Sequence, residues 1–294
     1  MTTDRKNIGE TQARVPVGVG QAASTLGEIR PALGNPVRAR GATPKAITVV
    51  IPARNEEALI ARTVEAALAS ARVLAGLPHA HLDETPVEII VIDNASTDRT
   101  AQVLAPLVEQ AGVRLVGCGE PKAACARNLG AELAQGRVLV FVDADTLMPP
   151  EALARIAVLC DEQGYEGGFT GLSSLDGGVK AQLWWAFWEH VRALPIARAK
   201  AMSALMFVTR AVFHELGGFH EGRTLGEEWS ILAGLYKKRP AKFAYDRTLT
   251  AMTSSRRMEL QPFGYARVLL QYVRIVLSPE ADVRYSDAIR GQAA

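Results

Sequence analysis

Residues 137–145 have the sequence Arg-Val-Leu-Val-Phe-Val-Asp-Ala-Asp, an apolar run that ends in Asp143 and Asp145. The run predicts a buried strand of a parallel sheet, because strands covered on both faces are apolar throughout. Open α/β sheets bind ligands outside the carboxyl ends of their strands. Two carboxylates at such an end suit a hard divalent cation, Mg2+ or Mn2+, which can in turn hold a diphosphate. Asp143 and Asp145 are therefore the predicted metal ligands.

Two simpler interpretations of these aspartates stay open at this point. Pro149-Pro150-Glu151 predicts the start of a helix with an acidic first turn, so Asp145 could cap that helix instead. Alternatively, both aspartates could lie in a solvated loop. The rest of the chain favours the metal site over both.

Strands and helices alternate on either side of this segment. Strands are expected at residues 47–51, 87–92, 113–116 and 138–142, and helices at 56–74, 100–110 and 122–134. The second helix is expected to bend or break near Pro106. This alternation predicts an α/β fold, a mostly parallel central sheet flanked by helices.

Composition suggests how the chain is divided. Residues 1–44 are rich in Gly, Pro, Thr, Ala and Arg without any period, which predicts a disordered leader. The main domain is expected at residues 45–255, and a C-terminal helical extension and tail at 256–294. The net charge of +2 gives no indication of nucleic-acid binding.

Location can also be predicted from the sequence. The three cysteines, Cys118, Cys125 and Cys160, form no Cys-x-x-Cys pair, which is typical of reduced thiols in a cytosol. Neither a secretory signal nor an apolar stretch long enough to span a bilayer is visible. We expect a cytoplasmic protein, with the inner face of the membrane as an option.

Polar segments follow the first two predicted strands, at residues 52–57 and 93–98. Asn55, Ser96 and Thr97 are most simply explained as helix caps. Asp93 is different, because a carboxylate directly at a strand end precedes any cap position. We expect it to accept hydrogen bonds from the base or ribose of a ligand.

Several motifs occur in order along the chain: Val49–Glu57, Ile89–Asp98, Ala126–Gly130, Val140–Asp145, Met206–Arg210, Glu215–Phe219 and Gly226–Trp229. Together they resemble family 2 glycosyltransferases over about residues 46–255. The resemblance implies a single nucleotide-diphospho-sugar transferase domain of the GT-A type. The implied enzyme is a hexosyltransferase that uses a divalent cation to move a sugar from a nucleoside-diphosphate sugar to an acceptor hydroxyl with inversion. The Gln-x-x-Arg-Trp segment of processive members is absent, so a non-processive enzyme is expected.

The resemblance also implies the catalytic residues. Glu227 and Glu228 stand where the family has Glu-Asp, and Glu228 matches the position of the general base. Glu227 is the second candidate, and Trp229 is expected at the acceptor. The predicted donor-binding residues are Pro52, Arg54, Asn55, Glu56, Asp93, Lys122, Arg127, Asn128, Asp143, Arg256 and Arg257.

The basic residues of this set have open alternatives. Arg54, Lys122 and Arg127 could equally be solvated surface charges. Arg256 and Arg257 could close over the diphosphate or form an ordinary basic loop. The sugar, the nucleotide and the acceptor are not predicted.

Three tryptophans, Trp184, Trp185 and Trp188, fall within five residues and cannot all share one helical stripe. They could line an acceptor groove, meet a membrane surface that presents a lipid-linked acceptor, or pack in the core. A second amphipathic helix is expected at residues 263–277, with Tyr265, Val268, Leu269, Tyr272, Val273 and Val276 toward one side. Packing of this helix on the domain is the preferred interpretation.

Two other classes of protein remain as alternatives. Haloacid-dehalogenase-type phosphatases also place Asp-x-Asp after an apolar strand, but Leu147 stands where they have Thr or Val. A catalytically silent sugar-nucleotide or protein-binding module that keeps the fold is the second. A Rossmann dehydrogenase is disfavoured, because Gly117-Cys118-Gly119 lacks the third glycine at Lys122.

Overall fold

The computed structural model describes residues 46–77, 87–175, 177–201, 203–222 and 230–277. Three sequence predictions lie outside these ranges: the leader at 1–44, the tail after residue 277, and the segment with Glu227, Glu228 and Trp229. The described residues all belong to one structural unit, residues 38–294.

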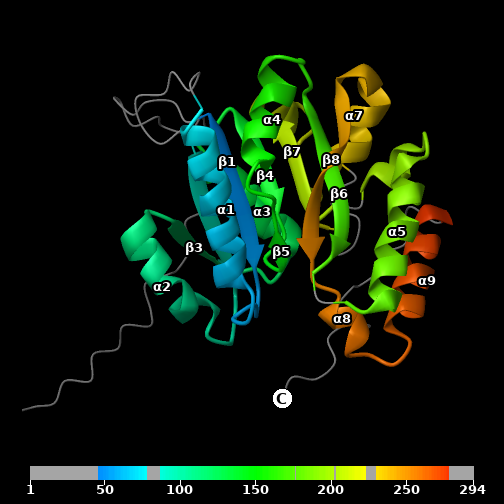
Figure 1. The fold of residues 1–294 in the computed structure, drawn as a ribbon, viewed down its shortest axis with the longest axis horizontal. Coiled ribbons are helices and arrows are strands. Elements are labelled where there is room, and N and C mark those ends of the chain that lie inside the picture. Colours follow the sequence, from blue (N-terminus) through cyan, green and yellow to red (C-terminus); the bar gives the residue numbers. More distant parts are fainter. Residues whose placement is uncertain (1–45, 78–86, 176, 202, 223–229, 278–294) are drawn as a thin grey trace, which may run out of the picture. The chain divides into compact units, whose positions relative to one another are not determined.

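A mixed eight-stranded sheet runs through the described part of the chain in the order β3-β2-β1-β4-β7-β6-β8-β5 (Figure 1). The strands are β1 Ile47–Ala53, β2 Val87–Asn94, β3 Arg114–Cys118, β4 Val138–Val142, β5 Thr146–Leu147, β6 Gly167–Ser174, β7 Leu205–Thr209 and β8 Phe243–Thr253. The first four strands of this order pair in parallel, as do β6 and β8, whereas β7 and β5 run antiparallel to their neighbours. The predicted α/β class with a mostly parallel sheet is confirmed.

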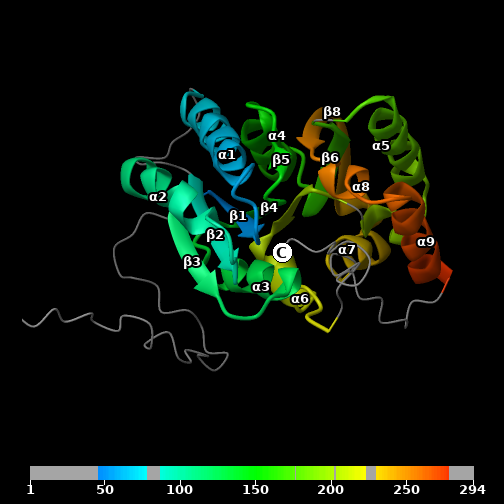
Figure 2. The same ribbon diagram turned by 90° about the horizontal axis from the view of Figure 1, so that it is seen from below.

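Helices cover both faces of the sheet (Figures 1 and 2). They are α1 Ile60–Ala75, α2 Thr100–Ala111, α3 Ala123–Leu133, α4 Ala152–Asp161, α5 Val179–Ala193, α6 Arg210–Glu215, α7 Leu232–Lys238, α8 Arg256–Glu259 and α9 Gly264–Leu277. Alternate residues of β1 point to opposite faces, so Val49 and Ile51 join a core cluster with α1 and α4, while Val50 joins one with α3, α6 and α7. Two covered faces explain why β1 and β4 are apolar throughout.

The first predicted helix begins later than expected. α1 starts at Ile60 rather than Glu56. Asn55 has a φ of 53°, which lies in the left-handed region and cannot open a right-handed helix. The backbone N–H of Glu56 donates to Thr100 Oγ1 at 2.9 Å, so the chain is anchored in a loop at this point.

Of the predicted bend or break at Pro106, the break is wrong, because α2 continues through this residue to Ala111, and the bend stays a prediction. Proline removes one backbone hydrogen bond from the helix. Packing of Leu104 and Leu107 against the core offsets this loss.

The pairing of β6 with β8 leaves no room for a side chain at Gly168. A Cβ atom there would lie 2.0 Å from the carbonyl oxygen of Ala244. We expect Gly168→Ala to lower the free energy of unfolding by about 1–3 kcal/mol or more, because backbone must move to relieve the clash. Urea denaturation measures this change.

Gly117 in β3 is the matched control, because a Cβ atom there meets nothing within 4 Å. Gly117→Ala should leave stability within about 1 kcal/mol of the wild type. Equal unfolding midpoints for the two variants would contradict the close approach of β6 and β8.

Candidate active site

The loops after β1 and β2 are fastened to each other at the carboxyl edge of the sheet. The N–H of Asn55 donates to Ser96 Oγ at 3.1 Å, and the N–H of Thr97 donates to Asn55 Oδ1 at 2.7 Å. The helix-cap interpretation of these three residues is therefore wrong: the N-cap positions are Leu59 and Arg99, and neither makes a side-chain cap hydrogen bond. The three polar side chains instead set the shape of the edge.

A second pair of hydrogen bonds joins the same two loops. The N–H of Glu57 donates to Asp98 Oδ2 at 3.1 Å, and the N–H of Arg99 donates to Glu57 Oε2 at 2.9 Å. Asp93, at the end of β2, is half-buried, and its Oδ1 accepts the N–H of Ser96 at 3.1 Å. This contact holds the Asp93 carboxylate in place at the sheet edge.

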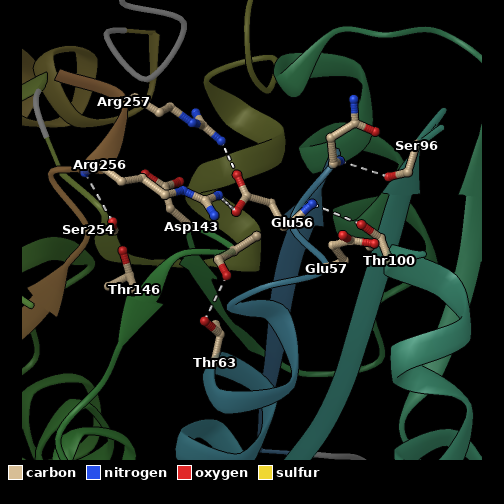
Figure 3. Close-up of polar contacts among 12 residues, drawn as sticks. Glu56, Glu57, Thr63, Ser96, Thr100, Asp143, Thr146, Ser254, Arg256 and Arg257 are labelled. Atoms are coloured by element: carbon tan, nitrogen blue, oxygen red, sulfur yellow. Dashed lines mark hydrogen bonds and ion pairs between the residues drawn. The ribbon is translucent and has the colours of Figure 1, made fainter. Parts of the chain in front are cut away.

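Glu56 joins three segments that are distant in the sequence. Glu56 is only 1% exposed, and its carboxylate oxygens accept hydrogen bonds from the guanidinium groups of both Arg256 and Arg257 (Figure 3). The two arginines lie in the short helix α8 rather than in a loop, and their contact with a diphosphate stays a prediction. Glu56 therefore holds both guanidinium groups at this edge of the sheet.

Arg127 supports the first aspartate of the Asp-x-Asp motif. Its guanidinium donates to Asp143 Oδ1 at 2.7 Å, and its side chain is buried beside the ring of Phe219. The surface-charge alternative is therefore wrong for Arg127. The Asp143 carboxylate remains partly exposed, so it is held on one side and accessible on the other.

Asp145 is in a different electrostatic state. Burial raises the pKa of its carboxyl group to about 7, and the nearby carboxylates of Glu56 and Asp143 add to the rise, while Arg257 and Arg256 oppose it. Among the described residues, no hydrogen bond to its side chain is found. The alternative role as a cap is wrong, because α4 begins only at Ala152 with Glu151 in the N-cap position.

These carboxylates fit a cation that arrives with a diphosphate. The described residues contain no cluster of three or more His, Cys, Asp and Glu side chains of the kind that forms an all-protein metal cage. Mg2+ in phosphate-binding enzymes typically takes only one or two carboxylates and completes its shell with water and substrate phosphates. Asp143 and Asp145, on one tight turn after β4, supply such a donor set.

Asn128 has a structural contact that was not predicted. Its Nδ2 donates to the carbonyl of Phe219 at 2.9 Å and its Oδ1 accepts the N–H of Phe219 at 2.9 Å. Gly218 has a φ of 76°, and a Cβ atom there would lie 2.9 Å from Asn128 Oδ1. Donor binding by Asn128 stays a prediction, and the observed role is to hold the turn after α6.

The remaining predicted donor residues lie near the same edge. Pro52 and Arg54 are half-buried at the end of β1, and Lys122 is exposed at the N-cap position of α3. Sequence reasoning gave no role to Thr100 or Ser255, which bind the Glu56 backbone and Trp185 respectively. Neither residue belongs to a recognisable sequence motif, so their roles are visible only in the tertiary contacts.

The tryptophan cluster is turned toward the protein. Trp188 is buried, Trp184 packs edge-on against Trp188 and Tyr265, and Trp185 Nε1 donates to Ser255 Oγ at 3.0 Å. The core-packing interpretation is therefore confirmed for Trp188, and these side chains do not form the outward apolar surface. The preferred packing of the 263–277 helix on the domain is confirmed by Tyr265, which contacts α5 through Trp184.

The fold and this edge define an α/β protein of the GT-A type, with an acidic pair and an arginine pair at the carboxyl ends of parallel strands. Residues 48–203 match the family model described as "Glycosyl transferase family 2". That match covers more than half of the chain, which therefore belongs to glycosyltransferase family 2 and carries a glycosyltransferase domain.

Two curated relatives illustrate the similarity. "Succinoglycan biosynthesis protein ExoO" of Rhizobium meliloti is 31% identical over 134 residues, covering 45% of this chain and 35% of that protein. "Undecaprenyl-phosphate 4-deoxy-4-formamido-L-arabinose transferase" of Pectobacterium carotovorum is 30% identical over 128 residues, covering 42% and 35% respectively. The chain thus spans about a third of the length of the curated relatives it matches.

A solved structure supports the fold. Glucosyl-3-phosphoglycerate synthase from Mycobacterium tuberculosis, in complex with Mn2+, uridine diphosphate and glucosyl-3-phosphoglycerate, aligns with a TM-score of 0.54 at 20% identity. The alignment covers 78% of this chain and 79% of that one. Separately, none of the described helices has the length and hydropathy that crossing a bilayer requires.

Proposed function

We propose that this protein is a cation-dependent, inverting, non-processive hexosyltransferase that moves a sugar from a nucleoside-diphosphate sugar to an acceptor hydroxyl. The observation that carries the proposal is the meeting of Asp143 and Asp145 with Arg256 and Arg257 at one sheet edge. Anionic groups beside a guanidinium pair suit a cation-bound diphosphate, since each charge of the ligand then has a partner.

Donor binding would use residues of three loops. Asp93, held at the end of β2, is proposed to accept hydrogen bonds from the base or ribose of the donor. Arg256 and Arg257, which are hydrogen-bonded to Glu56 in this structure, are proposed to contact the diphosphate. Arg127 is proposed to keep the Asp143 carboxylate oriented toward it. The further donor contacts proposed are those of Pro52, Arg54, Asn55, Lys122 and Asn128.

Sugar transfer would proceed by direct displacement. A bound cation supplies Lewis-acid neutralisation of the leaving diphosphate. Glu228 is proposed to take the proton of the acceptor hydroxyl as that oxygen attacks the anomeric carbon from the side opposite the diphosphate. The attack inverts the anomeric centre, and Trp229 is proposed to contact the acceptor.

We propose that the acceptor of the sugar is linked to a lipid. The support is the name of one relative, undecaprenyl-phosphate 4-deoxy-4-formamido-L-arabinose transferase, of which the chain matches about a third.

Donor binding can be tested by thermal unfolding with UDP-, GDP- and dTDP-sugars, each with and without Mn2+. One of these donors should raise the unfolding temperature only when Mn2+ is present, because a ligand that binds the folded state alone stabilises it. The gain is about 2.7 kcal/mol at a hundred times the dissociation constant. No shift with any donor in either condition would contradict the proposal.

The phosphatase alternative predicts a different result from the same protein. It requires release of inorganic phosphate from simple phosphoesters without any turnover of donor sugar. The silent-module alternative predicts donor binding without turnover of any kind.

A further inference from the structure

The outer faces of α5 and α9 expose large apolar side chains in two stripes. The helices lie side by side at one end of the sheet (Figures 1 and 2), in contact through Trp184 and Tyr265, whose ring centroids are 5.3 Å apart. On α5 the exposed residues are Val179, Leu183 and Phe187. Leu270 and Val273 are exposed on α9, and Phe263 is exposed directly before that helix. We call these six residues the α5–α9 face.

The spacing of these residues shows that the exposure is systematic. Val179, Leu183 and Phe187 follow one another at intervals of four, so they share one side of α5. Leu183 is 66% exposed, Leu270 is 68% exposed and Phe263 is 82% exposed. Contiguous exposed apolar side chains of this size mark an interaction surface rather than a surface in contact with water alone.

Two exposed cationic side chains lie beside this face, Lys180 on α5 and Arg267 on α9. The exposed carboxylate of Glu259, on α8, accepts a hydrogen bond from the hydroxyl of Tyr265 at 2.6 Å. Glu189, the one acid of α5, is turned inward, where it accepts hydrogen bonds from the N–H of Leu172 and the guanidinium of Arg192. The sequence of α9, residues 264–277, contains no Asp or Glu.

Apolar and cationic side chains together distinguish three possible partners of the α5–α9 face: a second copy of the chain, its own C-terminal segment and a lipid surface. A second copy of the chain would add the same cationic side chains, Lys180 and Arg267, to the contact without an opposite charge to pair with them, which is unfavourable. The segment after α9, residues 278–294, contains three acids and two arginines, and it has no sustained apolar period that could cover these stripes. An anionic lipid surface matches both properties, because basic side chains meet the headgroups and apolar ones enter the acyl boundary.

We propose that the α5–α9 face binds the surface of a bilayer that contains anionic lipid. The face is connected to the candidate site by α8, since Arg256 and Arg257 contact Glu56 and the adjacent Ser255 accepts a hydrogen bond from Trp185 of α5. A protein bound in this way would keep its sheet edge close to acceptors carried by the membrane. Vesicle binding itself does not depend on the transferase activity proposed above.

Flotation of the full chain with vesicles tests the proposal. Vesicles of phosphatidylcholine with about a third phosphatidylglycerol should carry the wild-type protein to the top of the gradient, and pure phosphatidylcholine vesicles should carry much less. Leu270→Glu and Arg267→Glu should each reduce the floated fraction at least about fivefold, because the first puts a charge in the acyl boundary and the second reverses an attraction.

Two matched controls lie on the far side of the chain's fold. Leu77, after α1, is exposed, and Arg72 is exposed in the last turn of α1. Leu77→Glu and Arg72→Glu change the same residue types and should float like the wild type. Circular dichroism of all four variants establishes that each is folded.

Three results would overturn the proposal. The first is wild-type protein that stays with neither vesicle type. The second is a dimer by light scattering that Leu270→Glu dissociates, which assigns the face to a second copy. The third is vesicle binding that appears only after removal of residues 278–294, which assigns the face to the chain's own C-terminal segment. A donor-induced thermal shift without vesicles tests the transferase proposal separately.

Discussion

Replacing Glu228 with Gln is expected to lower turnover by about two to four orders of magnitude, the usual contribution of general-base catalysis. Gln keeps the size and hydrogen-bonding capacity of the side chain but cannot accept the proton of the acceptor hydroxyl. Donor binding should therefore survive. Steady-state transfer rates and donor-induced thermal shifts, measured on the same preparation, separate the two effects.

Glu227→Gln is the matched control for this prediction. The two carboxylates are adjacent in the sequence, and the resemblance to the family assigns the position of the base to Glu228. We expect Glu227→Gln to retain most of the activity. If Glu227→Gln abolishes turnover while Glu228→Gln remains near wild type, the roles of the two residues are reversed.

Replacing Asp145 with Asn should abolish the Mn2+-dependent stabilisation by donor and lower turnover by about a hundredfold or more. The neutral amide is a poor ligand for a hard cation, and Lewis-acid neutralisation of the leaving diphosphate contributes several kcal/mol to the reaction. Isothermal calorimetry with donor and Mn2+ measures the loss of binding. Full donor affinity in excess chelator would refute the metal site.

Asp161→Asn is the control, because Asp161 is an exposed aspartate that pairs with Arg137 at the end of α4, and surface ion pairs contribute little.

The pH dependence of stability provides a second measurement on the cation-free protein. The pKa of Asp145 is raised to about 7 from 3.8, so the folded state holds a proton that the unfolded state releases between these values. Stability should therefore fall as the pH rises from about 4 to 7, and Asp145→Asn should reduce that fall. An unchanged profile in the variant would contradict the burial of this carboxyl group.

The contact of Glu56 with two arginines links these predictions to the architecture. Arg256 and Arg257 stand on α8, which continues into α9 and the α5–α9 face. Binding of a diphosphate and docking of this face would therefore act on neighbouring residues of one short segment.

The sequence by itself determined the α/β class and the position of Asp143 and Asp145 directly after a strand of the sheet. Apolar runs such as 138–142, each followed by polar residues, predict strands buried on both faces, because the hydrophobic period is a local property of the chain. The helices expected between these strands then predict parallel pairing, with the carboxyl ends at one edge. The order of the motifs then indicated the family, which the match over residues 48–203 shows. The placing of Asp143 at the end of β4 followed from that pattern alone.

Tertiary structure alone decided which residues act together. The Glu56 carboxylate meets Arg257 across 201 positions of sequence, and Asn55 meets Ser96 instead of capping a helix. The pKa of Asp145 depends on what buries it, and Trp184 of α5 packs against Tyr265 of α9. Periodicity shows that a helix has an apolar side, but it does not show which neighbour covers that side, since distant contacts leave no local pattern in the sequence.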